Sequence, residues 1–197
     1  MTYQPDSRVQ YIVQHYSATP IESDFTAADI DRMHRARSFR EIGYHYFIRK
    51  NGMVETGRDM SQPGKFEVGA HCRGSNSNSI GICVEGGVTR AAINVGVDNR
   101  TPAQIDAQIK LIRELLVRFP NAEVVGHKDM PEAATQCPGY DAAAWWASVV
   151  ASVAVRKPSK SEPQNAKSEP QNAKSEPQGW FARILELLAS LIKGSRT

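Results

Sequence analysis

The sequence predicts an α/β fold, a mixed central β-sheet flanked by helices, over residues 1–155. Short apolar runs typical of strands alternate along the chain with longer runs whose apolar residues recur at helical spacing. Because the two kinds of segment follow one another, they favour a layered α/β domain. With 197 residues and 41% hydrophobic content, the chain can form one compact domain of this kind plus an appendage.

The expected strands are short, and one pair is joined by a recognisable turn. Asn51-Gly52 is typical of a tight hairpin turn, since these residues tolerate a positive φ. The apolar run Tyr11 to His15 and the run 122–127 have the length and composition of buried strands. Strands are therefore expected at residues 11–15, 44–47, 53–56, 79–85 and 122–127.

Three helices are expected in the same region. A first helix is predicted near residues 27–36. Thr101 followed by Pro102 is typical of an N-cap with proline in the first helical position, which predicts an amphipathic helix over 103–119. Asp141 stands in the same way before a helical run at 142–155.

Three residues that are far apart in the sequence form a candidate zinc site. His15 and His127 each stand near the end of a predicted strand, and a turn-rich loop carries Cys137 back toward them. Two imidazoles and one thiolate would leave a fourth tetrahedral position open for water, which is the arrangement of a catalytic zinc ion. The spacing does not match a compact zinc finger, so by spacing alone these are ordinary buried histidines and a cysteine.

The character of the chain changes at residues 156–178. A seven-residue unit, Lys-Ser-Glu-Pro-Gln-Asn-Ala, begins at Lys160, again at Lys167 and again at Lys174. Each unit contains a proline and no large apolar residue, so the segment can form neither a packed core nor a coiled-coil seam. It is expected to be a disordered linker.

Residues 179–197 predict an amphipathic helix. At about 100° per residue, the apolar side chains from Trp180 onward fall in one broad sector opposite Arg183 and Glu186. Fourteen helical residues reach only about 21 Å, so the helix would lie in a membrane interface rather than span the bilayer. Docking on the catalytic domain and self-association are the alternatives. The membrane-binding candidates are Trp180, Phe181, Ile184, Leu188 and Leu191.

Charge and cysteine content limit the partners and the compartment. The net charge of +3 and the pI near 8.8 suit anionic surfaces such as cell-wall polymers or acidic headgroups, whereas a nucleic-acid reader would carry a denser basic stripe. The N-terminus lacks the features of a secretory signal, so we expect the protein to be held in the host cytoplasm before release to the periplasm and cell wall. We also expect a monomer. Cys72 and Cys83 are then expected to be free thiols, with a disulfide as the alternative.

Five short motifs, at residues 15–19, 42–46, 52–58, 78–82 and 127–138, together resemble one enzyme family. They occur in the order found in type 2 N-acetylmuramoyl-L-alanine amidases, and are most similar to the T7 lysozyme-like branch, which is related to peptidoglycan recognition proteins. The resemblance implies the same fold, zinc ligation by the residues named above, and hydrolysis of the amide between N-acetylmuramic acid and L-alanine in peptidoglycan.

The resemblance also suggests two catalytic side chains. Tyr44 is the candidate donor for the oxyanion formed when the amide is attacked, because a phenol stays protonated at neutral pH. The alternative is a tyrosine that only packs in its strand. Thr135 stands where T7-like and recycling amidases commonly have lysine, and resembles the threonine of catalytic peptidoglycan recognition proteins. A neutral hydroxyl should stabilise the oxyanion less than a lysine would.

Other polar residues are assigned from the same comparison. Cys83 stands where recycling amidases carry a glutamate, which argues against a recycling enzyme. Glu85, which alternates onto the same strand face, is a weaker candidate base. His71 and Asn78 lie in motifs that resemble those of the family's substrate groove, which implies that they bind substrate. The alternative is that each side chain only braces a loop. A structural role is expected for His45, and a position on a helix surface for His34.

Two classes of function remain. The first is a zinc amidase, a phage or prophage endolysin that a separate membrane-permeabilising protein releases to the wall. The second is a non-catalytic peptidoglycan-binding protein. Recognition-only members usually lack the zinc cysteine, so Cys137 favours the enzyme. A polymerase-regulating role, performed in one branch of the family, is neither supported nor excluded by the sequence.

Overall fold

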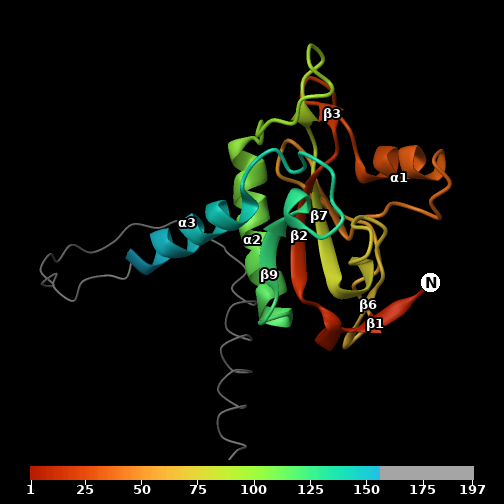
Figure 1. Cartoon of the computed structure of the whole chain (residues 1–197), viewed down its shortest axis with the longest axis vertical. Helices are drawn as coiled ribbons and strands as arrows, with labels where there is room; N and C mark the ends of the chain where they lie inside the picture. Colours follow the sequence, from red (N-terminus) through yellow and green to blue (C-terminus); the bar gives the residue numbers. More distant parts are fainter. Residues whose placement is uncertain (156–197) are drawn as a thin grey trace, which may run out of the picture. The chain divides into compact units, whose positions relative to one another are not determined.

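The computed structural model describes residues 1–155 of the chain (Figure 1). The expected linker at 156–178 and the expected helix at 179–197 lie outside the described residues. Within residues 1–155, no helix has both the length and the apolar character needed to cross a membrane.

A five-stranded mixed sheet forms the centre of the fold, as predicted. Its strand order is β5-β4-β7-β2-β9. The four strands β4, β7, β2 and β9 run parallel, and β5 pairs antiparallel with β4. The bounds are β2 Tyr11–Tyr16, β4 Tyr46–Ile48, β5 Val54–Thr56, β7 Ser79–Val84 and β9 Glu123–Gly126.

Two small strand pairs stand beside this sheet, and neither was predicted. One pairs β1 with β6 in antiparallel fashion, and the other pairs β3 with β8 in parallel. These strands are two or three residues long, too short for an alternating pattern to identify them. Their bounds are β1 Tyr3–Pro5, β3 Thr19–Pro20, β6 Lys65–Glu67 and β8 Gly87–Val88.

All three expected helices are present, and two of them begin where the capping residues Thr101 and Asp141 predict. In α2, the side chain of Thr101 accepts a hydrogen bond from the backbone of Gln104, whose side chain accepts one in return from the backbone of Thr101. In α3, the Asp141 carboxylate accepts a hydrogen bond from the Ala144 amide at 2.9 Å. The helices are α1 Ala27–Arg35, α2 Pro102–Arg118 and α3 Ala142–Val155, and the short 3₁₀ turns are η1 Asp6–Arg8, η2 Asn76–Asn78 and η3 His127–Asp129.

The two faces of the sheet have different partners. Along β7, Ile80 and Ile82 belong to a core cluster with Ile112 of α2, and α2 covers this face (Figure 1). Cys83 alternates to the other face, where it packs with Ile30 of α1. The sheet thus separates α2 from α1, and His15 of β2 lies on the face away from α2.

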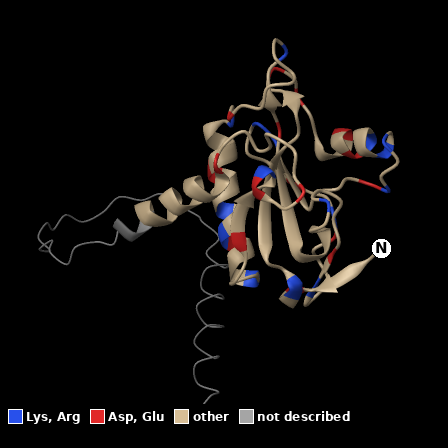
Figure 2. Ribbon diagram, in the orientation of Figure 1, with Lys and Arg blue, Asp and Glu red and all other residues tan. Residues whose placement is uncertain are grey.

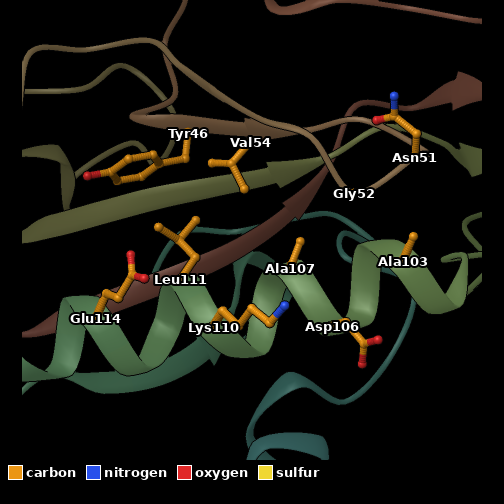
Figure 3. A pocket seen from close by; sticks show the side chains of 10 residues that line it. All are labelled: Tyr46, Asn51, Gly52, Val54, Ala103, Asp106, Ala107, Lys110, Leu111 and Glu114. Carbon is orange, nitrogen blue, oxygen red and sulfur yellow. The ribbon is translucent and has the colours of Figure 1, made fainter. Parts of the chain in front are cut away.

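A hollow of about 560 Å³ lies on the α2 side, between that helix and the β4–β5 hairpin (Figure 3). Gly52 holds the hairpin turn with a φ of +83°, as Asn51-Gly52 predicted. The lining includes Asp106, Lys110 and Glu114 but no histidine or cysteine. This hollow therefore does not contain the candidate metal ligands.

Candidate metal centre and substrate cleft

Parallel pairing of two strands brings His15 and His127 together. In the register of β2 and β9, Gln14 pairs with Gly126. His15 and His127 are the next residues along the two strands, at the carboxyl ends. Their ring centroids are 4.5 Å apart. Two residues separated by more than one hundred positions thereby become neighbours.

The loop after η3 returns Cys137 to these two histidines. The Lys128 amide donates to the Cys137 carbonyl at 2.7 Å, which closes the loop. The Tyr16 amide donates to the Cys137 Sγ at 3.3 Å, and that sulfur lies 3.7 Å from the Nδ1 of His15. One donor atom from each of His15, His127 and Cys137 lies within 4.8 Å of the other two.

The three donor atoms fit a zinc ion. Zn–N and Zn–S bonds of about 2.0 to 2.3 Å in a tetrahedron put neighbouring donors about 3.5 Å apart. The distance from Cys137 Sγ to His15 Nδ1 already matches this value, and the remaining separations require only small side-chain movements. Imidazole nitrogen and thiolate sulfur are also the donors that zinc prefers.

Burial determines the protonation of the three residues. It lowers the pKa of His15 well below its ordinary value, and the neighbouring His71 and His127 lower it further. Burial also lowers the pKa of His127, so both imidazoles are neutral at physiological pH. For Cys137, burial raises the pKa to about 12, against the opposing hydrogen bond from the Tyr16 amide. Metal binding must therefore displace the thiol proton.

Tyr44 stands beside the metal-ligand cluster. Its ring centroid is 5.2 Å from that of His15, and its ring packs against the core cluster of Ile30, Phe47 and Cys83. Burial raises the pKa of Tyr44 well above its ordinary value, and the neighbouring cysteines add to this rise, whereas Arg37 opposes it. The hydroxyl is therefore protonated and able to donate a hydrogen bond.

Two adjoining cavities form a cleft over this cluster. The first, of about 190 Å³, is lined by the three candidate ligands together with Tyr44 and Thr135. The second, of about 440 Å³, extends past His71 toward the exposed Arg73. Residues common to both cavities are His34, Arg37, Tyr44 and His127.

His34 corrects the sequence prediction, because it is not on a helix surface. It is 8% exposed, its Nδ1 accepts a hydrogen bond from the Gly43 amide at 2.9 Å, and its ring lies 5.4 Å from that of Tyr44. The signal for its position was present in the sequence: Ile30 and His34 are four residues apart and so share one face of α1. That face is the one that packs on the sheet.

Arg37 was also missed as a cleft residue. It follows the end of α1, where the last turn is basic (Figure 2). Of the described residues that line the first cavity, it is the one lysine or arginine. Arg37 thus brings positive charge to the same cavity as Thr135, whose hydroxyl is neutral.

Thr135 lies in this cleft, and its hydroxyl also forms a hydrogen bond with the backbone. Its Oγ1 accepts a hydrogen bond from the amide of Cys137 at 3.1 Å. The hydroxyl therefore helps to hold the loop that presents the cysteine. This contact adds a structural role to the catalytic one that the sequence suggested.

Asn78 does not reach the cleft. It precedes β7 at the amino end of that strand, whereas His15 lies toward the carboxyl end of the parallel strand β2. Its side-chain amide donates to the Gln10 side chain at 2.7 Å, and it lines a separate surface hollow with Ser77. These contacts give no support for the substrate-binding role expected for Asn78.

The contacts of Glu85 do not support its assignment as a catalytic base. Its carboxylate is fully buried and accepts hydrogen bonds from the amides of Phe25 at 2.7 Å and Lys50 at 2.9 Å. Cys83 is a free buried thiol beneath Tyr44, and burial raises its pKa well above the ordinary value. None of the described residues lining the first cavity is a carboxylate.

His45 has the structural role that was expected. Its Nδ1 accepts a hydrogen bond from the Gly81 amide at 2.9 Å, and its Nε2 donates to the carbonyl of Glu67 at 2.8 Å. Both ring nitrogens are thus bonded to backbone. Cys72, the other expected free thiol, is unpaired and packs with Val13 in the core.

Comparison with known proteins agrees with this geometry. The family model for N-acetylmuramoyl-L-alanine amidases (Amidase_2) matches residues 5–140. The chain is 37% identical over 135 residues to an endolysin of Klebsiella phage KP32, an alignment covering 68% of this chain and 83% of the relative. It is 33% identical over 136 residues to the endolysin of Escherichia phage T7, with the same two coverages of 68% and 83%.

A solved structure of an amidase has the same fold. N-acetylmuramoyl-L-alanine amidase LysC from Clostridium intestinale superimposes with a TM-score of 0.59 at 28% identity, covering 78% of this chain and 91% of that one. The chain therefore belongs to the type 2 N-acetylmuramoyl-L-alanine amidase family and is an enzyme that acts on peptidoglycan.

Proposed function

We propose that this enzyme cleaves the amide between the lactyl group of N-acetylmuramic acid and L-alanine with one zinc ion held by His15, His127 and Cys137. The convergence of the three donor atoms within 4.8 Å on the floor of a cleft carries this proposal. When bound, zinc would polarise the amide carbonyl and make a water molecule more acidic.

The protonation of the ligands supports this role. Neutral His15 and His127 offer lone pairs without first losing a proton, because burial has already lowered the pKa of each. The protein supplies three ligands, so one tetrahedral position stays available to water or substrate. A closed structural site would need a fourth side chain.

Tyr44 and Arg37 provide what the attacked carbonyl needs. The Tyr44 hydroxyl keeps its proton and can donate a hydrogen bond to the developing oxyanion. Arg37 lines the same cavity, and its guanidinium favours negative charge there. We assign Thr135 a smaller contribution, since its hydroxyl is neutral and can donate one hydrogen bond without supplying positive charge.

The nature of the cleaved bond gives the direct test. Digestion of purified sacculi should expose new α-amino groups of L-alanine and no new reducing sugar ends, because an amide rather than a glycosidic bond is attacked. Glycosidases need a pair of carboxylates at the scissile bond, whereas the first cavity contains none among the described residues. If reducing ends accumulate in step with the loss of turbidity, the amidase assignment for this cleft is wrong.

We further propose that residues 179–197 bind anionic membrane surfaces while the enzyme acts on the cell wall. The support is the sequence alone: a broad apolar sector, three basic residues against the single Glu186, and a proline-containing tether long enough to separate the two activities. This fits a phage or prophage endolysin that reaches the wall after release from the cytoplasm.

Deletion of residues 179–197 should separate the two activities. We expect nearly unchanged hydrolysis of membrane-free peptidoglycan, but a sharp loss of binding to anionic liposomes and of lysis of intact Gram-negative cells from outside. Leu188→Lys should have the same effect, since it puts a charge in the centre of the apolar face. Ser190→Lys, on the polar face, is the matched control. Liposome binding by the truncated protein as tight as that of the full chain would exclude this role.

A further inference from the structure

A second imidazole lies directly behind the candidate ligand His15. The Nε2 of His15 and the Nδ1 of His71 are 3.1 Å apart, and the two rings meet edge to face with an interplanar angle of 84°. Both residues are buried. The other nitrogen of His15, Nδ1, faces the sulfur of Cys137. Each nitrogen of His15 therefore has a defined neighbour, one in the candidate metal site and one outside it.

This contact determines which tautomer of His15 can bind a metal. Coordination through Nδ1 requires a free lone pair there, so the ring proton must sit on Nε2. That proton can then be donated to Nδ1 of His71, provided that this nitrogen is itself unprotonated. The reverse hydrogen bond, from His71 to His15, would put the proton of neutral His15 on Nδ1 and block coordination.

The ring of His71 is held in place by the backbone around it. A Cβ atom added at Gly81 would lie 2.6 Å from the Cγ of His71, and one added at Gly69 would lie 2.6 Å from its Cδ2. Asn76 fixes the segment, because its Oδ1 accepts a hydrogen bond from the His71 amide at 2.8 Å. The imidazole thus occupies a slot that only glycine leaves open on two sides.

The same geometry engages one nitrogen of His71 with His15. Its Nδ1 is used by His15, and its Nε2 is buried and has no hydrogen-bond partner among the described residues. His71 lines the second cavity, so the substrate-binding role expected for it stays a prediction.

We propose that His71 is a positioning residue for the metal centre: its Nδ1 accepts a hydrogen bond from the Nε2–H of His15 and so holds that ring in the tautomer and orientation that present Nδ1 to zinc. The inference rests on the proposed zinc site. Metal-binding histidines usually donate their second N–H to a carboxylate, a carbonyl or water. In this protein, the acceptor of that hydrogen bond would be the imidazole of His71.

Zinc affinity, measured by competition with a chromophoric chelator, tests the proposal without relying on activity. His71→Phe fills the slot but removes the acceptor, and we expect zinc affinity to fall roughly 10- to 100-fold. The cobalt-substituted protein should also show altered ligand-field bands. His71→Asn, which can restore an acceptor oxygen, should recover part of the loss. Ser77→Ala, in the same segment but remote from the cleft, is the control.

A measurement on the unaltered protein covers the case in which a variant does not fold. Nitrogen-15 NMR of the zinc-loaded full chain should show the proton of His15 on Nε2 and the metal on Nδ1. Zinc on Nε2, or wild-type zinc affinity and cobalt spectrum in His71→Phe, would overturn the inference. If the wild-type chain binds no zinc at all, the proposed function fails instead, so the two failures are distinguishable.

Discussion

Replacing Cys137 with alanine should abolish stoichiometric zinc binding and reduce peptidoglycan hydrolysis to near background. Only two protein donors would remain, and the buried cluster would lose the one ligand that brings a negative charge. Since changes to groups behind a ligand cost roughly 10- to 100-fold in metal affinity, loss of a ligand itself should cost more than about 100-fold. Metal analysis after dialysis and an α-amino release assay measure the two effects.

The matched control is Cys72→Ser, which removes another buried thiol that packs in the core without joining the ligand cluster. It should keep its zinc. A further check follows from the pKa of about 12 that burial gives the Cys137 thiol. Because binding releases this proton, zinc affinity should rise about tenfold per pH unit between pH 7 and pH 9. Full zinc occupancy and activity in Cys137→Ala would disprove the assignment.

Tyr44→Phe should lower the turnover number by roughly 10²- to 10³-fold while zinc stays bound, since one donor to the oxyanion is lost. The phenyl ring can keep the packing of Tyr44 against Ile30 and Phe47, so the fold should be preserved. Steady-state release of α-amino groups, with zinc content measured on the same samples, gives the result.

Thr135→Ala is the comparison for this variant. Its effect on turnover should be smaller, and part of it should appear as weaker zinc binding, because the Thr135 hydroxyl accepts a hydrogen bond from the Cys137 amide. Turnover of the Tyr44→Phe protein equal to that of the wild type would show that Tyr44 only packs in the core.

Local chemistry made much of the fold predictable. The Thr101-Pro102 pair identifies the start of α2, and Asn51-Gly52 identifies the hairpin, since each depends on backbone preferences of neighbouring residues. The convergence of His15 with His127 was also within reach. Both follow strands at their carboxyl ends, and parallel strands bring such ends to one edge of a sheet.

The wrong assignments of single residues concern contacts between distant segments, whereas β1, β3, β6 and β8 were missed because they are too short to show a pattern. His34 shares a helix face with Ile30, but the sequence does not show that this face packs on the sheet and meets the Gly43 backbone of a later loop. Asn78 was expected in the groove because its motif matched, but the direction of β7 carries it to the opposite end of the sheet. The carboxylate of Glu85 is occupied by the amides of Phe25 and Lys50, and no local pattern predicts such partners.

Because β2 pairs with β9, a metal ion bound by His15 and His127 would also stabilise the edge of the sheet. Among the strands of residues 1–155, β9 is the outermost on its side of the sheet, is four residues long and has β2 as its one strand neighbour. An ion shared by His15 and His127 would cross-link these strands at their ends. Zinc at about 100 times its dissociation constant would add about 2.7 kcal/mol to the free energy of unfolding. Withdrawal of the metal would therefore loosen a sheet margin, where unpaired backbone groups invite aggregation.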